Sequence, residues 1–160
     1  MNKNIKFLII FFTIFFFNSN LTFAAMSGGN DNDKLALYKQ GKKLVYKAKK
    51  LEKKNKVEKA KKIYLKAYDK LEKAYAKDKK NPDILNYLGY TLRKTGSLEK
   101  AEIYYLKGLE IDAGHLGINE YLGELYVQTN RIDLAKERLN ILQGCNCEEY
   151  EDLKKLIKNK

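Results

Sequence analysis

The sequence predicts an all-α protein built as a stack of about three helix hairpins with a C-terminal helix over its end. Three observations lead to this prediction. Apolar residues recur with helical spacing, and no alternation of Val, Ile and Thr indicates a strand. Proline occurs once and tryptophan not at all. A segment also returns after 34 positions, which is typical of a repeat array.

The repeat is clearest where residues 87–109 are laid over residues 121–143. Large residues match large ones and small residues match small ones. The matched pairs are Tyr87 with Tyr121, Leu88 with Leu122, Gly89 with Gly123, Leu92 with Tyr126, Leu98 with Ile132, Ala101 with Ala135, and Tyr105 with Leu139. Small residues let two helices approach while large ones fill the space between them. Each unit is therefore expected to be a pair of packed helices.

These two units resemble the tetratricopeptide repeat over about residues 82–145. The residues that carry the resemblance are Leu85, Leu88, Gly89, Leu92, Ala101, Tyr105 and Gly108, then Leu122, Gly123, Tyr126, Ala135 and Leu139. The resemblance implies a right-handed superhelical stack in which the first helices of successive units line a concave groove. It also implies binding of a protein or peptide, without enzymatic activity.

A third, upstream copy is predicted in residues 34–80. Val57, Ala60, Tyr64 and Ala67 repeat the spacing of Leu98, Ala101, Tyr105 and Gly108. Ala60 lies 41 positions before Ala101, which leaves seven extra residues, or about two helical turns. A second helix lengthened by Leu71 and Ala74 accommodates them on the same apolar face. A plain amphipathic hairpin that precedes two repeats is the alternative.

The predicted repeats thus occupy about residues 34–80, 82–115 and 116–145, and the tail at 146–160 is expected to be a capping helix. Its apolar edge consists of Tyr150, Leu153, Leu156 and Ile157. Such an edge suits a helix that covers the exposed end of a stack. A helix that binds a partner is the alternative for this tail.

Residues 1–24 have the layout of a secretory signal peptide. Lys3 and Lys6 precede an apolar run from Phe7 to Phe17, and Thr22 and Ala24 mark a cleavage site. An uncleaved anchor is the alternative, although the run is short for a membrane span. We expect an exported protein, periplasmic in a bacterium and otherwise secreted, with residues 25–33 as a flexible lead-in.

Cys145 and Cys147 are separated by one residue near the end of the last repeat. Oxidising compartments favour disulfides, so an exported chain is expected to pair them as a local staple. Two thiolates that bind a soft metal or exchange disulfides are the alternative, which would make this a thiol protein.

Charge is concentrated in the upstream part of the chain. Residues 34–80 hold 19 lysines against five acidic residues, whereas residues 81–160 hold 13 acidic against 11 basic residues. The lysine-rich part could bind an anionic polymer or membrane surface, or form only a solvated face. Nucleic acid is not expected, because no nucleic-acid-binding motif appears and lysine far outnumbers arginine.

No catalytic motif, phosphate loop or cluster of metal ligands appears, so neither a cofactor nor a small-molecule substrate is inferred. The lone His115 is expected to begin a helix after the turn that joins two repeats. The groove residues predicted from the alignment are Asn86, Tyr90, Arg93, Lys94, Glu120, Glu124, Val127 and Gln128, with Lys42, Val45, Lys49 and Lys53 in the first unit. The resulting groove is mixed in sign, and the full Lys/Asn set that holds a carboxyl terminus in some members of the family is not present.

Overall fold

The computed structural model describes residues 31–160, and the prediction of an all-α protein is confirmed. The predicted signal peptide at residues 1–24 lies outside the described residues. The helices are α1 (Asp31–Glu52), α2 (Val57–Lys77), α3 (Pro82–Thr95), α4 (Leu98–Ile111), α5 (Leu116–Gln128), α6 (Ile132–Leu142) and α7 (Glu148–Lys158). None of these helices is both long and apolar enough to cross a bilayer.

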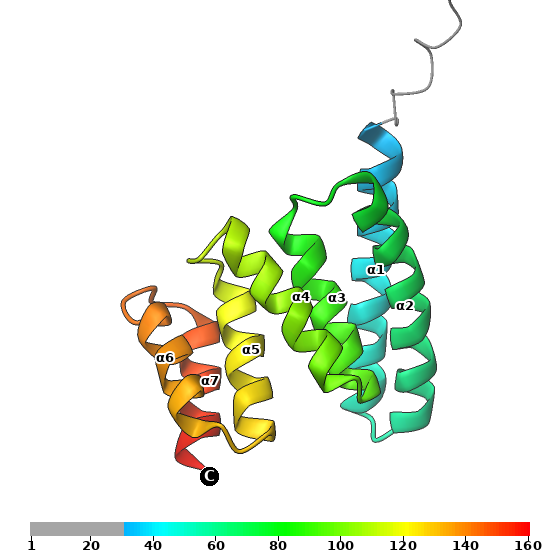
Figure 1. Ribbon diagram of the computed structural model, residues 1–160. Coiled ribbons are helices and arrows are strands. Elements are labelled where there is room, and N and C mark those ends of the chain that lie inside the picture. Colours follow the sequence, from blue (N-terminus) through cyan, green and yellow to red (C-terminus); the bar gives the residue numbers. More distant parts are fainter. Residues whose placement is uncertain (1–30) are drawn as a thin grey trace, which may run out of the picture.

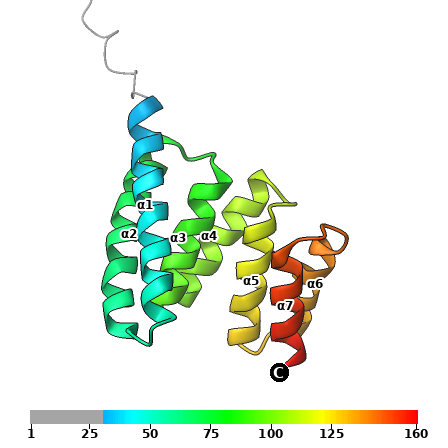
Figure 2. The same ribbon diagram turned by 180° about the vertical axis from the view of Figure 1, so that it is seen from behind.

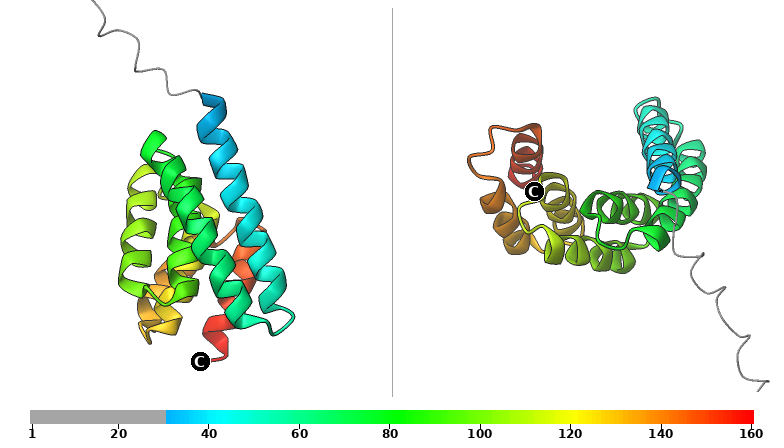
Figure 3. Two further views of the ribbon diagram at one scale, coloured as in Figure 1. Left: turned by 90° about the vertical axis from the view of Figure 1, so that its right-hand side faces the viewer. Right: turned by 90° about the horizontal axis from the view of Figure 1, so that it is seen from above.

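Consecutive helices pair into three hairpins that stack side by side (Figure 1). The first hairpin is α1–α2, the second α3–α4 and the third α5–α6, and α7 packs against both α5 and α6. Seen from behind, α1, α3, α5 and α7 follow one another across the molecule (Figure 2). Seen from above, the stack curves into an arc with α1 and α7 at its two ends (Figure 3). This is the predicted superhelical stack.

The turns inside the three hairpins have the same backbone structure. Asn55, Gly96 and Asn130 each adopt a positive φ, and they are spaced by 41 and 34 positions like the repeats themselves. One hydrogen bond recurs at each turn, from Lys56 N to Leu51 O, from Ser97 N to Leu92 O and from Arg131 N to Tyr126 O, at 2.8–2.9 Å. A left-handed residue followed by this bond is a common way to end a helix. The first hairpin is therefore a true copy of the other two.

The seven extra residues of the first hairpin lengthen its second helix, as predicted. Helix α2 has 21 residues and α4 has 14. Leu71 and Ala74, in the added turns, are fully buried, and Gly41 of α1 lies directly against Leu71. The extension therefore adds packed core and not a loop.

Helices pack closely at equivalent glycines in the second and third hairpins, but the side chain that contacts the glycine comes from a different helix in each. In the second hairpin Gly89 of α3 packs against the ring of Tyr105 on α4, and a Cβ at Gly89 would overlap that ring. In the third hairpin the equivalent Gly123 packs against Leu153, which belongs to α7. Tyr105 and Leu153 are both fully buried.

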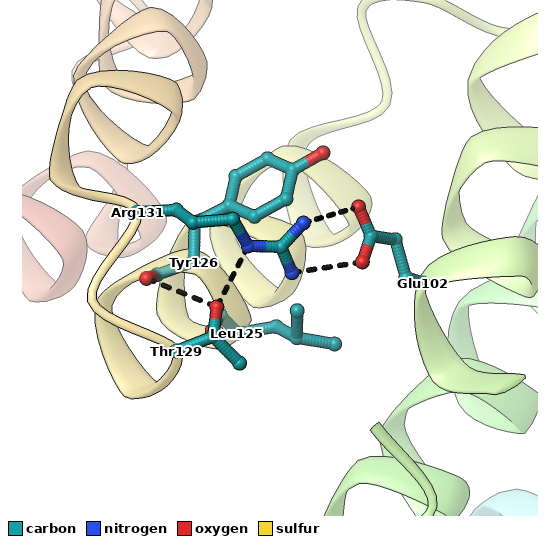
Figure 4. Close-up of polar contacts among 5 residues, drawn as sticks. All are labelled: Glu102, Leu125, Tyr126, Thr129 and Arg131. Atoms are coloured by element: carbon teal, nitrogen blue, oxygen red, sulfur yellow. Dashed lines mark hydrogen bonds and ion pairs between the residues drawn. The ribbon is translucent and has the colours of Figure 1, made fainter. Parts of the chain in front are cut away.

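An arginine joins the second hairpin to the third (Figure 4). Arg131 donates two hydrogen bonds of 2.8 Å to the carboxylate of Glu102 on α4. Its Nε donates to Thr129 Oγ1 at 2.9 Å, and its guanidinium lies 4.5 Å from the ring centre of Tyr126. A bidentate arginine–carboxylate pair fixes the relative orientation of the two groups as well as stabilising their contact.

Candidate functional site

The inner side of the arc carries two adjoining cavities of about 580 and 490 Å³. Both are lined by Tyr46, Lys49, Glu120, Tyr121, Glu148 and Asp152, so they form a single depression, which we call the concave groove. Its walls come from α1, α3, α5 and α7, and the turn before α5 closes one end. The stacked first helices thus produce the groove together with the tail helix.

The structure places most of the predicted groove residues in the cavity walls. Six of them line the concave groove, namely Asn86, Tyr90, Arg93, Lys94, Glu120 and Glu124, together with Lys49 and Lys53 of the first unit. Gln128 lines neither cavity and is exposed near the end of α5. Lys42 lies above the rings of Tyr38 and Tyr87 instead, at 5.8 and 5.7 Å from their centres.

Val45 and Val127 belong to the core and not to the groove. They are 1% and 2% exposed. Each lies one turn after a glycine at which helices pack closely, Gly41 and Gly123 respectively. Residues four apart share one face of a helix, so these two valines point into the packed interface.

Tyrosine rings form the floor of the concave groove. Tyr90 and Tyr121 lie with ring centres 4.7 Å apart, and Tyr87 also lines the groove, with its ring centre 6.1 Å from that of Tyr38, which lines neither cavity. Lys49 extends over Tyr90 and Tyr121, 4.8 and 5.2 Å from the ring centres, and its Nζ donates a 3.0 Å hydrogen bond to Tyr121 Oη. Cation–π contacts of this kind hold the lysine against the rings.

Tyr46, Tyr87 and Tyr121 line the cavities but were not among the predicted groove residues. Tyr87 and Tyr121 were read as repeat residues, yet their rings are only partly buried and reach the groove. A tyrosine has an apolar body and a polar tip, and the alignment alone does not show which of these faces the cavity. For Tyr46, the available signal in the sequence was an aromatic residue standing among lysines, which could have placed it at the groove.

A buried ion pair crosses the floor from α3 to α5. Arg93, whose side chain is 9% exposed, pairs with Glu124. Its Nε has no hydrogen-bond partner, and neither does the buried hydroxyl of Tyr105. Next to it Lys94 pairs with Glu52 of α1 at 2.9 Å. Removing either charge of a buried pair leaves the other uncompensated, so Arg93 and Glu124 are required together.

The α5–α7 side of the concave groove is acidic. Glu120 is only 7% exposed and makes no hydrogen bond or ion pair with any residue that the structure describes. Burial raises its pKa to about 8, and Glu124, Glu149 and Asp152 add to the effect while Lys49 opposes it. A carboxyl group with this pKa is largely protonated at neutral pH.

Helix α7 supplies the outer part of this acidic side through Glu148, Glu149 and Asp152. From the sequence, the tail was expected to be only a cap or a partner-binding helix. Three acidic residues at positions i, i+1 and i+4, opposite the apolar edge, were the signal that this helix also presents a charged face.

His115 is the N-cap residue of α5 and lies at the turn between two repeats, as predicted. Its Nδ1 accepts a 3.1 Å hydrogen bond from the N–H of Ile118, so that its proton is on Nε2. Nε2 lies 3.4 Å from Asp83 Oδ1, and the hydrogen bond from His115 lowers the pKa of Asp83. The imidazole thus caps a helix and joins it to α3.

Cys145 and Cys147 are bonded to each other in the structure, at the entry to α7. Cys145 also packs against the core beneath it. Within residues 31–160 no three His, Cys, Asp or Glu side chains are grouped so that they could hold a metal ion. The lysines of the first hairpin are spread over α1 and α2, and Lys49, Lys50 and Lys53 among them line the groove.

Comparisons with known proteins agree with the repeat architecture. A family model described as tetratricopeptide repeat matches residues 70–103. No curated protein matches the sequence. The first TPR of Spaghetti (RPAP3), bound to the HSP90 peptide SRMEEVD, is similar in structure, with a TM-score of 0.59 and 18% identity over 80% of this chain and 93% of that one.

Two further structures have the same fold. The second TPR domain of human RPAP3, in complex with the HSP70 peptide SGPTIEEVD, gives a TM-score of 0.53 and 16% identity over 79% of this chain and 99% of that one. PcrH in complex with the chaperone binding region of PopD gives a TM-score of 0.53 and 16% identity, over 82% of this chain and 93% of that one. The repeat match, the three equivalent turns and this likeness together show that the chain has the tetratricopeptide-repeat fold.

Proposed function

We propose that this protein is a non-enzymatic adaptor that binds a peptide segment of another protein in the concave groove. The observation that carries the proposal is the groove itself, two adjoining cavities with a tyrosine floor and charged walls. Aromatic side chains supply large contact area, and a few charged groups at fixed positions supply orientation and specificity.

The shape of the groove favours a peptide over a compact small molecule. The two cavities adjoin on the inner side of the arc and are lined from four different helices. An extended segment can contact all four helices, whereas a compact ligand would reach only one cavity. Structures of the same fold include complexes with the peptides SRMEEVD and SGPTIEEVD, which supports this choice of ligand.

Export to the cell envelope is part of the proposal. Its support is the arrangement of residues 1–24, with two lysines, an apolar run and a small-residue cleavage site. The adaptor would therefore act in the periplasm of a bacterium, or outside the cell in another host. Mass spectrometry of protein from its native compartment should find a chain that begins at Ala25, and a chain that still begins at Met1 would contradict export by cleavage.

Selection from a random dodecapeptide library tests the binding function directly. Protein made from the full 160-residue sequence is used as bait, and affinities of the enriched peptides are measured by fluorescence polarisation. We expect Tyr121→Ala to weaken the enriched peptides at least about tenfold, because a buried aromatic anchor carries a large share of binding energy.

The matched control is Tyr75→Ala, which removes an equally half-buried ring from α2, outside both cavities. Circular dichroism melts of both variants establish that each is folded. Equal loss of affinity in the two variants, or no enriched peptide at all, would show that the groove is not a peptide site.

A further inference from the structure

We propose that the concave groove selects peptides that carry a lysine or arginine, and that the cation of this side chain pairs with Glu120. This inference rests on the peptide-binding function proposed above and adds the chemistry of the partner. The subsite lies between α3, α5 and α7, in the larger of the two cavities.

Glu120 is the first observation. It lines both cavities although it is only 7% exposed, and no described residue gives it a hydrogen bond or an ion pair. A buried carboxylate without a partner is costly, and a cation that arrives with a ligand removes that cost. Elsewhere in the groove the buried charges are already paired, as Arg93 is with Glu124.

Asn86 is the second and independent observation. It occupies the position 34 residues before Glu120, lines the same cavity and is 5% exposed. Its Oδ1 is buried without a hydrogen-bond partner. The subsite therefore offers the carboxyl group of Glu120 and the amide oxygen of Asn86, which no described residue engages, and both are acceptors once Glu120 is ionised. Ammonium and guanidinium groups, with three and five N–H donors and no acceptor, are the side-chain groups that match them.

The surrounding charges also favour a cation from outside. On α5 itself Glu124 faces Glu120 and is engaged by Arg93 of α3. On α7 Glu149 and Asp152 face it, and neither makes an ion pair. Lys49 of α1 is the basic group that faces Glu120, and its ammonium group is held by the Tyr121 hydroxyl and by two rings. The side of the groove next to α7 remains net negative.

An organic cation fits this subsite better than a metal ion does. No group of three or more His, Cys, Asp and Glu in residues 31–160 is arranged to hold a metal. The ring of Tyr121 lies in the wall beside Glu120, where it can pack against the aliphatic stem of a lysine or the plane of an arginine. A peptide side chain brings both the stem and the charge.

The dodecapeptide selection described above also tests this inference. We expect the enriched peptides to share a lysine or arginine at one position. For one such peptide at pH 9, where Glu120 is ionised, replacing arginine with citrulline, which has the same shape without the charge, should weaken binding about tenfold, and Glu120→Gln should do the same. The matched control Glu110→Gln removes one carboxylate from the exposed surface of α4 and should leave affinity unchanged.

The pH dependence gives a readout that a purely structural role of Glu120 would not produce. Arginine stays charged at every pH used, whereas Glu120 becomes ionised as pH rises through about 8. Affinity for the arginine peptide should therefore rise about tenfold from pH 6 to pH 9. The citrulline peptide and the Glu120→Gln variant should show no such rise.

The outcomes separate this inference from the proposed function. Peptides enriched without a basic residue, and weakened by Tyr121→Ala, would overturn the cation subsite and leave the peptide function standing. No enriched peptide would overturn both. Self-association that Glu120→Gln abolishes would overturn the subsite by placing the lysine-rich helices of a second copy in the groove, and spermidine binding as tightly as the peptide would show a polyamine site instead.

Discussion

The second and third hairpins have the same sequence pattern, but only the second is complete on its own. Gly89 of α3 is covered by Tyr105 from its own partner helix α4. Gly123 of α5 is covered by Leu153 of α7, while Leu139, at the position equivalent to Tyr105, is not among the atoms nearest to it. Leu139 has a shorter side chain than Tyr105, and in the third hairpin the seventh helix, α7, packs against the glycine instead.

Because of this difference, the tail helix α7 has two roles, one in packing and one in the groove. Because α7 fills the gap at Gly123, it packs along α5 on the inner side of the arc. Its opposite face then has to line the concave groove, and there it carries Glu148, Glu149 and Asp152. Stability of the third hairpin and charge of the groove are therefore coupled through one helix.

The largest effect is expected where the third hairpin depends on α7. Leu153→Ala should lower the free energy of unfolding by about 2–5 kcal/mol, because it opens a cavity at a fully buried leucine. Urea denaturation measures the change. Leu156→Ala, on the same helix but 37% exposed, is the control and should cost much less. Equal losses would mean that α7 is not required to complete the third hairpin.

A second test adds a methyl group at each of the two equivalent glycines. Gly89→Ala should cost about 1–3 kcal/mol, because the added Cβ overlaps the rigid, buried ring of Tyr105. Gly123→Ala should cost less, because Leu153 has more rotamers and belongs to the terminal helix. Thermal melts of the two variants compare them, and a greater loss at Gly123 would reverse this ranking.

The cysteine pair at the entry to α7 is expected to contribute less. A Cys145→Ser/Cys147→Ser variant should fold and lose at most about 1.5 kcal/mol, because the closed ring is very short. Hydrogen exchange should locate the loosening in α7. Protein from its native compartment should weigh two hydrogens less than the reduced chain. Copper bound to native protein and absent from the double variant would favour the thiol alternative.

A pH-dependent effect is expected from the difference between Asn86 and Glu120, a neutral and an ionisable side chain at equivalent positions of two repeats. Burial raises the pKa of Glu120 from 4.5 to about 8, so folding retains a proton that the unfolded chain releases between these values. Wild-type stability should therefore fall across this range as pH rises, whereas Glu120→Gln should not share this loss.

Urea denaturation at pH 5 and pH 8.5 checks this expectation. The Glu120→Gln variant should gain stability over wild type at the higher pH and much less at the lower. Glu110→Gln, at an exposed position on α4, should differ from wild type equally at both values. A gain that does not depend on pH would mean that the carboxyl group of Glu120 does not titrate in this range.

The fold could be predicted from the sequence because the residues that pack within a hairpin recur at equivalent positions of the repeats. The pairing of Gly89 with Ala101, and the seven-residue surplus before Pro82, were enough to place the hairpins and to lengthen α2. Positions such as Arg93 and Glu124 followed from the same alignment. Those predictions needed only local periodicity, which a helix keeps over its whole length.

The α7 wall could not be predicted in the same way, because it depends on a contact between elements. The alignment gives no partner for Gly123 other than Leu139, so it did not predict that Leu153 packs against Gly123. The burial of Glu120 was not predicted either. Its polar side chain is typical of an exposed position, yet it is only 7% exposed and lines the same cavity as residues of α7.

The separation of charge across the concave groove has a consequence for the speed of binding. Lys50 of α1 and Lys53, just after the end of α1, line one part of the groove, while Glu149 and Asp152 of α7 line another, so the groove presents opposite charges to an approaching chain. A segment with a basic and an acidic end would be rotated into register before it touches the rings. Added salt should then slow association while changing dissociation little, because screening acts on the encounter and not on buried contacts.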